Sequence, residues 1–290
     1  MTLQAIILLL LKISIVLLVF GIGLTATHHD VSHLFRRPWT LLRTFFSMNI
    51  VMPVLVVAIA LAFELRHPVE IGLIALAISP VPPLLPKRQA QAGARGAYAI
   101  GLLFAMAVLS VVYIPVMIEL MDMIFPADLH MPFLAVVKLI LLTVLVPLLA
   151  GVTVRSFAAG FAGRIAKPVS LIATLMLVIG LLPVLFKMMP AIISLIGDGT
   201  VLAFVVFVVV GLFVGHFLGG PVPEDRPVLA LATASRHPAI AATIAIANFP
   251  EQKMVFPAIL LYLLINAIVC LPYMFRVRRR GASRAVTSPS

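Results

Sequence analysis

Apolar residues come in blocks of about 20 along the chain, and polar or proline-rich segments separate the blocks. A block of that length crosses a bilayer as an α-helix and is too long for a barrel strand of about ten alternating residues. We predict nine segments, the third and eighth of them interrupted: 3–24, 39–64, 69–95, 97–121, 131–155, 166–187, 199–219, 226–249 and 253–275. The pattern predicts an all-α polytopic membrane protein, a bundle of about nine transmembrane helices.

Composition supports a membrane protein. Of the 290 residues, 63% are hydrophobic and 11% are charged, a balance that excludes a soluble domain of this size. The single cysteine, Cys270, excludes disulfides and cysteine-based metal sites, so we expect no metal and no cofactor. The first apolar block lacks a basic region before it, which favours a retained span over a cleaved signal peptide.

The net charge of +11 is distributed over short loops and a tail, where the positive-inside rule accounts for it without a nucleic-acid partner. With nine spans, the basic connectors fall on one face and a mostly acidic set falls on the other. We therefore predict an integral protein of the cell inner (plasma) membrane, with the amino terminus outside and the carboxyl terminus cytoplasmic. The lipid bilayer is its expected environment, and the sequence does not indicate an oligomeric state.

The two halves of the chain have similar organisation. Residues 1–125 and 126–275 each end with an interrupted segment and a full helix, but the second half has one more helix at its start. Equivalent segments then cross in opposite directions, as in an inverted repeat that lacks one helix in its first half. We predict one transmembrane transporter domain over 1–275 and a disordered basic cytoplasmic tail over 276–290. The segments 30–38 and 156–167 are predicted to be short basic connectors at the membrane surface.

The two interruptions are the candidate functional site. In the first, the prolines Pro82, Pro83 and Pro86 precede Lys87, Arg88 and Gln89; in the second, Ser235, Arg236 and His237 precede Pro238. Prolines break helices, and a charge at membrane depth costs about 3 kcal/mol or more, so such residues mark a pathway or a site. Interrupted helices in corresponding positions of two halves are typical of a secondary transporter's binding site.

Each of these residues also has a structural interpretation. The three cations could snorkel to the cytoplasmic surface, and His237 could bond a freed carbonyl instead of relaying protons. Asn49, before Met52 and Pro53, is a candidate ligand or an interhelical hydrogen-bonding group. A stripe of glycines in the seventh segment favours close helix packing over chemistry: Gly211, Gly215 and Gly219.

Two stretches carry a family resemblance. Ala232–Phe249 resembles the second crossing segment of the bile acid:sodium symporter family, and Ile78–Leu102 resembles its first crossing segment. The resemblance implies a core domain with two unwound helices that cross near the midplane, and a panel domain that moves relative to it.

The sequence departs from that family where sodium ligands are expected. The Gly-Gly and Ser-Asn signature of sodium-coupled members aligns with Pro83, Leu84, Lys87 and Arg88, and the Glu and Gln-Asn signature aligns with Ala232, Arg236 and His237. Hydroxyl ligands on the following helix align with Gly101 and Ala105. Sodium requires oxygen ligands, so sodium binding is doubtful, and we hypothesise that Lys87, Arg88 and Arg236 occupy the former sodium sites.

We predict a secondary transporter of a small organic anion that works by alternating access, as a uniporter or linked to protons. The alternatives are a sodium-coupled symporter of the same family and a non-transporting membrane sensor or scaffold. The predicted segments contain no carboxylate at midplane depth and no Ser-His-Asp set, which argues against an enzyme.

Overall fold

The computed structural model describes residues 3–124 and 133–287, and this part of the chain contains helices and no strand. The helices are α1 (Leu3–Gly23), α2 (His28–Val31), α3 (Pro38–Phe46), α4 (Met52–Ala62), α5 (His67–Ile78), α6 (Leu85–Gln91), α7 (Gly96–Ile124), α8 (Phe133–Ile140), α9 (Val146–Phe157), α10 (Ala159–Ser194), α11 (Thr200–Leu218), α12 (Arg226–Ala234), α13 (Pro238–Asn248) and α14 (Val255–Thr287). Two π-helical turns, η1 (Ser47–Val51) and η2 (Leu141–Leu145), join α3 to α4 and α8 to α9.

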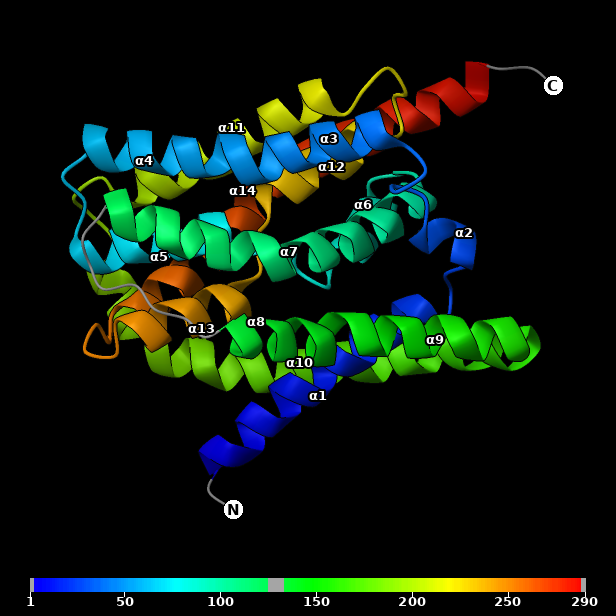
Figure 1. Cartoon of the computed structure of the whole chain (residues 1–290), viewed down its shortest axis with the longest axis horizontal. Coiled ribbons are helices and arrows are strands. Elements are labelled where there is room, and N and C mark those ends of the chain that lie inside the picture. The colour runs from blue at the N-terminus through cyan, green and yellow to red at the C-terminus, as the bar shows by residue number, and fades with distance from the viewer. Residues whose placement is uncertain (1–2, 125–132, 288–290) are drawn as a thin grey trace.

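Eight segments of the described chain are long and apolar enough to cross a membrane. The shorter apolar helix α5 pairs with α6 to form one further, interrupted segment, so each of the nine predicted segments corresponds to helical structure. The prediction of an all-α polytopic membrane protein is confirmed. The termini of the chain lie toward opposite ends of the long axis (Figure 1), as an odd number of crossings requires.

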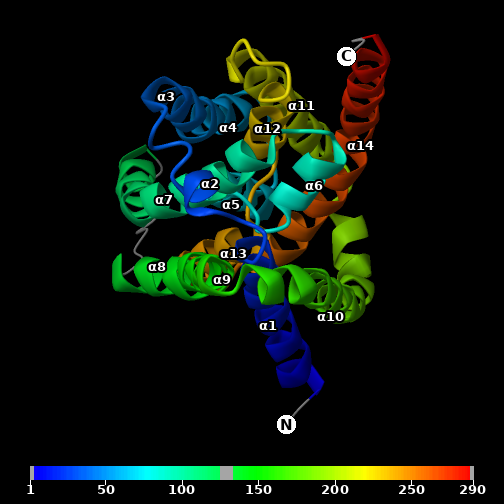
Figure 2. The same cartoon turned by 90° about the vertical axis from the view of Figure 1, so that its right-hand side faces the viewer.

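The helices are arranged in two layers (Figures 1 and 2). We call the layer of α1, α8, η2, α9 and α10 the panel, and the remaining long helices the core layer. Within the panel, α1 packs on both α9 and α10. Within the core layer, α11 packs closely on α12, and α13 packs on α5 and α14.

The glycine stripe of α11 explains how closely α12 approaches. A Cβ atom at Gly215 would lie 2.6 Å from the Ala230 Cα, and one at Gly211 would lie 2.8 Å from the Ala234 Cα. Real Cβ atoms do not approach that closely, so only glycine permits this contact. The packing interpretation of the stripe is confirmed, and the contact holds α12, which leads into the second interruption.

One sequence expectation about the connectors is wrong. Residues 156–167 are not a surface connector: α9 runs to Phe157 and α10 begins at Ala159, so only Ala158 separates them. At about 1.5 Å per residue, the 36 residues of α10 exceed the roughly 30 Å hydrocarbon thickness, which lets the first turns, with Arg164 and Lys167, extend beyond it. The segment 30–38 does connect α1 to α3, with the end of α2 at its start and the first residue of α3, Pro38, at its end.

The expectation of a disordered tail is also wrong as far as the structure describes it. Helix α14 continues from the ninth predicted segment to Thr287, because nothing in the sequence after Tyr273 breaks a helix until Pro289. The predicted boundary between the two repeats, 125–126, lies outside the described residues, and the division into repeats stays a prediction.

Candidate functional site

The two interruptions contact each other. The first lies between α5 and α6, at residues 79–84, and the second lies between α12 and α13, at residues 235–237. The backbone N–H of His237 donates to the carbonyl oxygen of Pro80 at 2.8 Å. A backbone N–H of one unwound segment therefore forms a hydrogen bond with a backbone carbonyl of the other. Lipid could not supply such a hydrogen bond.

Arg236 lies in this crossing and is 1% exposed. Its Nη1 donates to the carbonyl oxygen of Ser79 at 3.2 Å, and its Nη2 donates to the carbonyl oxygen of Met48. These contacts exclude the snorkelling interpretation for Arg236, because the guanidinium is buried among backbone carbonyls.

Both carbonyls are available because of the local sequence. Ser79 caps the C-terminus of α5, where carbonyl oxygens lack helical donors and carry partial negative charge. Met48 lies in the π-helical turn η1, five residues before Pro53, which has no N–H to donate back along the helix. The neighbouring Asn49 carbonyl accepts from the Tyr113 hydroxyl at 2.8 Å instead. Arg236 thus binds carbonyls that the chain leaves without backbone donors.

Helix α14 supplies two side chains that the sequence analysis missed. The hydroxyl of Tyr262 accepts from the Arg236 backbone N–H at 2.8 Å and donates to the Ala234 carbonyl at 2.9 Å. The Asn266 amide nitrogen also donates to the Ala234 carbonyl, at 2.9 Å. Both residues cap the C-terminal end of α12. The signal in the sequence was a polar residue, Asn266, inside the ninth apolar segment.

A cavity of about 220 Å³ lies beside the crossing, between the panel and the core layer. Its walls are mostly apolar side chains of α1, α10 and α14, and it also borders both interruptions. Among the predicted site residues, the lining includes Pro82, Pro83, Arg88, Ser235, Arg236, His237 and Pro238. The structure therefore brings seven of these residues together around one space, whose shape and lining are those of a ligand site.

Arg88 enters this cavity from α6. Its Nη1 donates to the Asn266 Oδ1 at 2.9 Å, and the Ser235 hydroxyl reaches the same oxygen at 3.5 Å. Arg88 forms no salt bridge in the described part of the chain. A guanidinium with one neutral partner and an open cavity beside it retains donors for an anion.

His237 has a defined hydrogen-bonding state. Its Nδ1 accepts from the Ile240 backbone N–H at 3.4 Å, which caps the N-terminus of α13. A neutral ring whose Nδ1 accepts carries its proton on Nε2. That Nε2 is buried and has no hydrogen-bond partner among the described residues. The ring therefore has a structural role as a helix cap, but it accepts from a backbone N–H and does not bond a freed carbonyl, as the sequence analysis had considered.

Four predicted site residues lie elsewhere. Lys87 donates to the Ser170 carbonyl at 3.3 Å and to the Thr174 hydroxyl at 3.0 Å, which links α6 to the panel helix α10. Gln89 is buried, and its amide donates to the Val228 carbonyl at 2.7 Å. Asn49 and Pro86 do not line the cavity: Asn49 is in η1, and Pro86 lies in the first turn of α6. Pro86 therefore starts a helix where the sequence analysis placed a break, because proline is favoured in a first turn.

The hypothesis that three cations occupy former sodium sites is limited by this geometry to Arg236. Only Arg236 binds backbone carbonyls at an interruption; Arg88 binds a side-chain amide, and Lys87 binds the panel. At Gly101, where a hydroxyl ligand was considered, a Cβ atom would lie 2.8 Å from the Asp30 carbonyl oxygen. The segment around α2 therefore fills the space that a side chain at position 101 would need.

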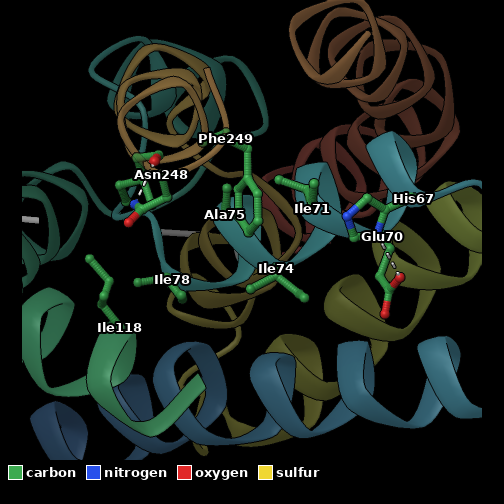
Figure 3. Close-up of a pocket in the computed structure, with 11 residues that line it drawn as sticks. His67, Glu70, Ile71, Ile74, Ala75, Ile78, Ile118, Asn248 and Phe249 are labelled. Atoms are coloured by element: carbon green, nitrogen blue, oxygen red, sulfur yellow. Dashed lines mark hydrogen bonds and ion pairs between the residues drawn. The ribbon is translucent and has the colours of Figure 1, made fainter. Parts of the chain in front are cut away.

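A second, smaller cavity of about 60 Å³ lies between α5, α7 and α13 (Figure 3). His67 and Glu70 form an ion pair at one side of it, with 3.6 Å between Nδ1 and Oε2. The rest of its lining is nearly all apolar, including Ile74, Ile78 and Ile118. It contains none of the predicted site residues.

Comparison with known families found one match, and it covers the first of the two interrupted segments. A family model described as Sodium Bile acid symporter family matches residues 12–195, more than half of the chain. The chain belongs to the sodium bile acid symporter family. As a member of this family it is a secondary transporter of the membrane, and members of the family are transporters and not enzymes. The match includes the first interruption and ends before the second, so Arg236 lies outside it. No curated protein matches the chain.

Proposed function

We propose that this symporter-family protein carries a small organic anion across the cell inner membrane by alternating access, without sodium. The amino terminus is outside and the carboxyl terminus cytoplasmic, since most basic residues of the loops lie at the same end of the helices as the arginines of α14. Transport is uniport or is linked to protons.

The observation that carries this proposal is the position of Arg236. Its guanidinium binds the Ser79 and Met48 carbonyls, which are the kind of ligand that a bound sodium ion would use. A tethered cation at this place neutralises the partial charge of the α5 C-terminus permanently. A sodium ion would be repelled by the positive charge of Arg236. Sodium binding at this place therefore cannot be coupled to transport.

The substrate site is the cavity of about 220 Å³. Its apolar walls accommodate a hydrocarbon body, and the guanidinium of Arg88 lies at its edge. An arginine pairs with a carboxylate through two parallel hydrogen bonds. The described residues that line the cavity include no acid, so an anion meets no opposing charge.

Alternating access follows from the two layers. The cavity borders the panel helices α1 and α10 on one side and the crossing on the other, so relative movement of the layers opens it to either face. Among the described residues, the layers are joined by polar contacts such as that of Lys87 with α10 and that of Arg66 with Asp198. Both are partly exposed and can exchange with water at low cost.

Accessibility of the cavity separates a transporter from a scaffold. Ala239 lines the cavity and is exposed, so Ala239→Cys in a Cys270→Ala background gives a reporter. Impermeant thiol reagents applied to either side of oriented vesicles are expected to label it from both sides, as the two states exchange. Labelling from one side alone, under all gradients, would support the locked scaffold and contradict transport.

Uptake into proteoliposomes then tests the coupling. A panel of radiolabelled carboxylates and sulfonates is compared in sodium and in choline, with and without a pH gradient. We expect accumulation of at least one anion at equal rates in sodium and choline. Uptake that requires sodium would favour the alternative of a sodium-coupled symporter.

A further inference from the structure

A groove on the outside of the core layer has the lining of a lipid site. It measures about 330 Å³ and is lined by Trp39, Leu42, Arg43 and Phe46 of α3 and by Leu218 of α11. The four α3 residues are spaced three and four apart, so they share one helix face. Trp39 is 73% exposed, Leu42 55% and Phe46 48%, and no other helix of the described chain covers them.

Arg43 interrupts this apolar face. It is exposed and forms no salt bridge in the part of the chain that the structure describes. Its Nη1 lies beside Gly220 in the turn after α11, within 3.3 Å of where a Cβ atom would be. Arg226 reaches the same turn, where its Nε donates to the Gly220 carbonyl at 3.0 Å. Arg43, which lines the groove, and Arg226 therefore both bring their guanidinium groups close to Gly220.

The nearby carboxylate is directed to another residue. Asp225 precedes Arg226 but is buried, and its Oδ1 lies 3.6 Å from the Nε of Arg95. Arg95 also donates its backbone N–H to the Glu224 carbonyl at 3.3 Å. Asp225 is thus directed to Arg95, Glu224 beside it is exposed, and neither acid forms a salt bridge with Arg43 or Arg226 in the described part of the chain.

The order of groups along α3 matches a phospholipid. Trp39 lies near the start of the helix, at the level where tryptophans gather at the membrane–water interface. Phe46 lies about two turns deeper, where acyl chains are, and Arg43 between them can reach back toward the headgroup level. An apolar channel that ends at two cations selects a ligand with a hydrocarbon chain and a net negative head.

We propose that this groove binds one anionic phospholipid, with an acyl chain along Trp39, Leu42, Phe46 and Leu218 and its phosphate at Arg43 and Arg226. A zwitterionic lipid also offers a phosphate, but its cationic group faces two guanidinium groups, so anionic lipid is preferred. This inference concerns the lipid-facing surface and does not depend on the substrate site.

Native mass spectrometry of the purified full chain tests it, with phosphatidylglycerol and phosphatidylcholine as competing probes. Wild-type protein is expected to retain one phosphatidylglycerol in preference to phosphatidylcholine. Arg43→Gln is expected to lower that preference about tenfold, as for loss of a charge-assisted hydrogen bond. Leu218→Trp, which fills the groove without changing charge, is expected to lower retention of the bound lipid as well.

Arg36→Gln is the matched control, since Arg36 is an exposed arginine at the same end that contacts His29 and does not line the groove. It is expected to change the preference by less than about twofold. Equal losses in Arg36→Gln and Arg43→Gln would mean general attraction to a basic surface and would overturn the proposal. A wild-type protein without preference for phosphatidylglycerol would overturn it too.

Discussion

The guanidinium of Arg236 donates to the carbonyl oxygen of Ser79 at 3.2 Å, so a side chain of the second interruption binds the helix end of the first. The backbone makes a parallel contact, from the His237 N–H to the Pro80 carbonyl at 2.8 Å. The crossing is therefore held by the protein's own donors, and Arg236 is fully enclosed within it. This relationship is the basis of the sodium-independent mechanism proposed above.

The first prediction concerns recognition of the anion. Arg88→Gln keeps a hydrogen bond to Asn266 but removes the positive charge from the cavity, so we expect the KM for the anion to rise about 10- to 100-fold. Lys87→Gln is the control, since Lys87 contacts α10 and does not line the cavity. A larger KM effect in Lys87→Gln than in Arg88→Gln would contradict the assigned site.

The second prediction concerns a contact between the layers. Arg66, at the start of α5, binds the Asp198 carboxylate through Nε at 2.7 Å and Nη2 at 2.6 Å, and its Nη1 donates to the Ser194 carbonyl at 2.6 Å. Asp198 has a positive φ of 43° and follows Gly197 in the turn between the panel helix α10 and the core helix α11. The contact therefore holds the connection between the panel and the core layer.

Arg66→Gln should cost little stability, about 1 kcal/mol or less, because the ion pair is exposed. We expect it to change the labelling rate of Ala239→Cys by up to about fivefold, since one conformation loses this contact. Lys187→Gln, on the same helix end, provides the control and should leave the rate unchanged. An identical labelling rate in Arg66→Gln and wild type would show that the contact does not distinguish the states.

The third prediction tests the close approach of α11 and α12. Gly215→Ala places a Cβ atom 2.6 Å from the Ala230 Cα, and the backbone must shift, so we expect a loss of about 1–3 kcal/mol in the free energy of unfolding. Gly163→Ala in α10 meets nothing within 4 Å and should be neutral or stabilising by up to about 1 kcal/mol. Thermal unfolding in detergent measures both. Equal midpoints for the two variants would contradict the packing described here.

The fourth prediction concerns pH. Burial is the main cause that lowers the pKa of His33, which lies outside the membrane-spanning segments, and the nearby Arg37 lowers the pKa further. The folded protein then binds this proton less tightly than the unfolded chain, whose pKa is about 6.5. The contribution of His33 to stability is complete above pH 6.5 and is lost as the pH falls through the window between 6.5 and the lowered pKa. Between pH 7.5 and pH 5, the midpoint of thermal unfolding should fall less in His33→Asn than in wild type. An equal fall in both proteins would contradict the contribution of His33.

Much of the fold was accessible from the sequence because apolar block length and proline position are strong local signals. Pro82, Pro83 and Pro238 located both interruptions, and the glycine spacing located the contact of α11 with α12. The length of α10 was not accessible, because the basic residues Arg164 and Lys167 suggest a loop although nothing in that stretch prevents a helix. Helix α14 exceeded its predicted end for the same reason.

The site was predicted in outline and not in its pairings. Sequence position suggested that Lys87, Arg88 and Arg236 act alike, but which carbonyls a cation reaches depends on tertiary contacts between residues far apart in the chain. Met48 and Ser79 are 188 and 157 positions from Arg236. The roles of Tyr262 and Asn266 depend on how α14 packs against α12, and a single sequence carries no signal for that contact.

Sodium dependence of thermal unfolding tests the central claim most directly. Purified protein is unfolded in sodium chloride and in choline chloride at equal ionic strength, beside Arg236→Gln and the exposed control Arg276→Gln. A ligand that binds the folded state raises stability by about 2.7 kcal/mol at 100 times its Kd, so bound sodium would be visible. Our account predicts that wild type and Arg276→Gln each unfold at the same midpoint in both salts. In Arg236→Gln we expect the free energy of unfolding to fall by about 3 kcal/mol, because the Ser79 and Met48 carbonyls lose their donor. A wild-type midpoint that rises in sodium and not in choline would contradict it.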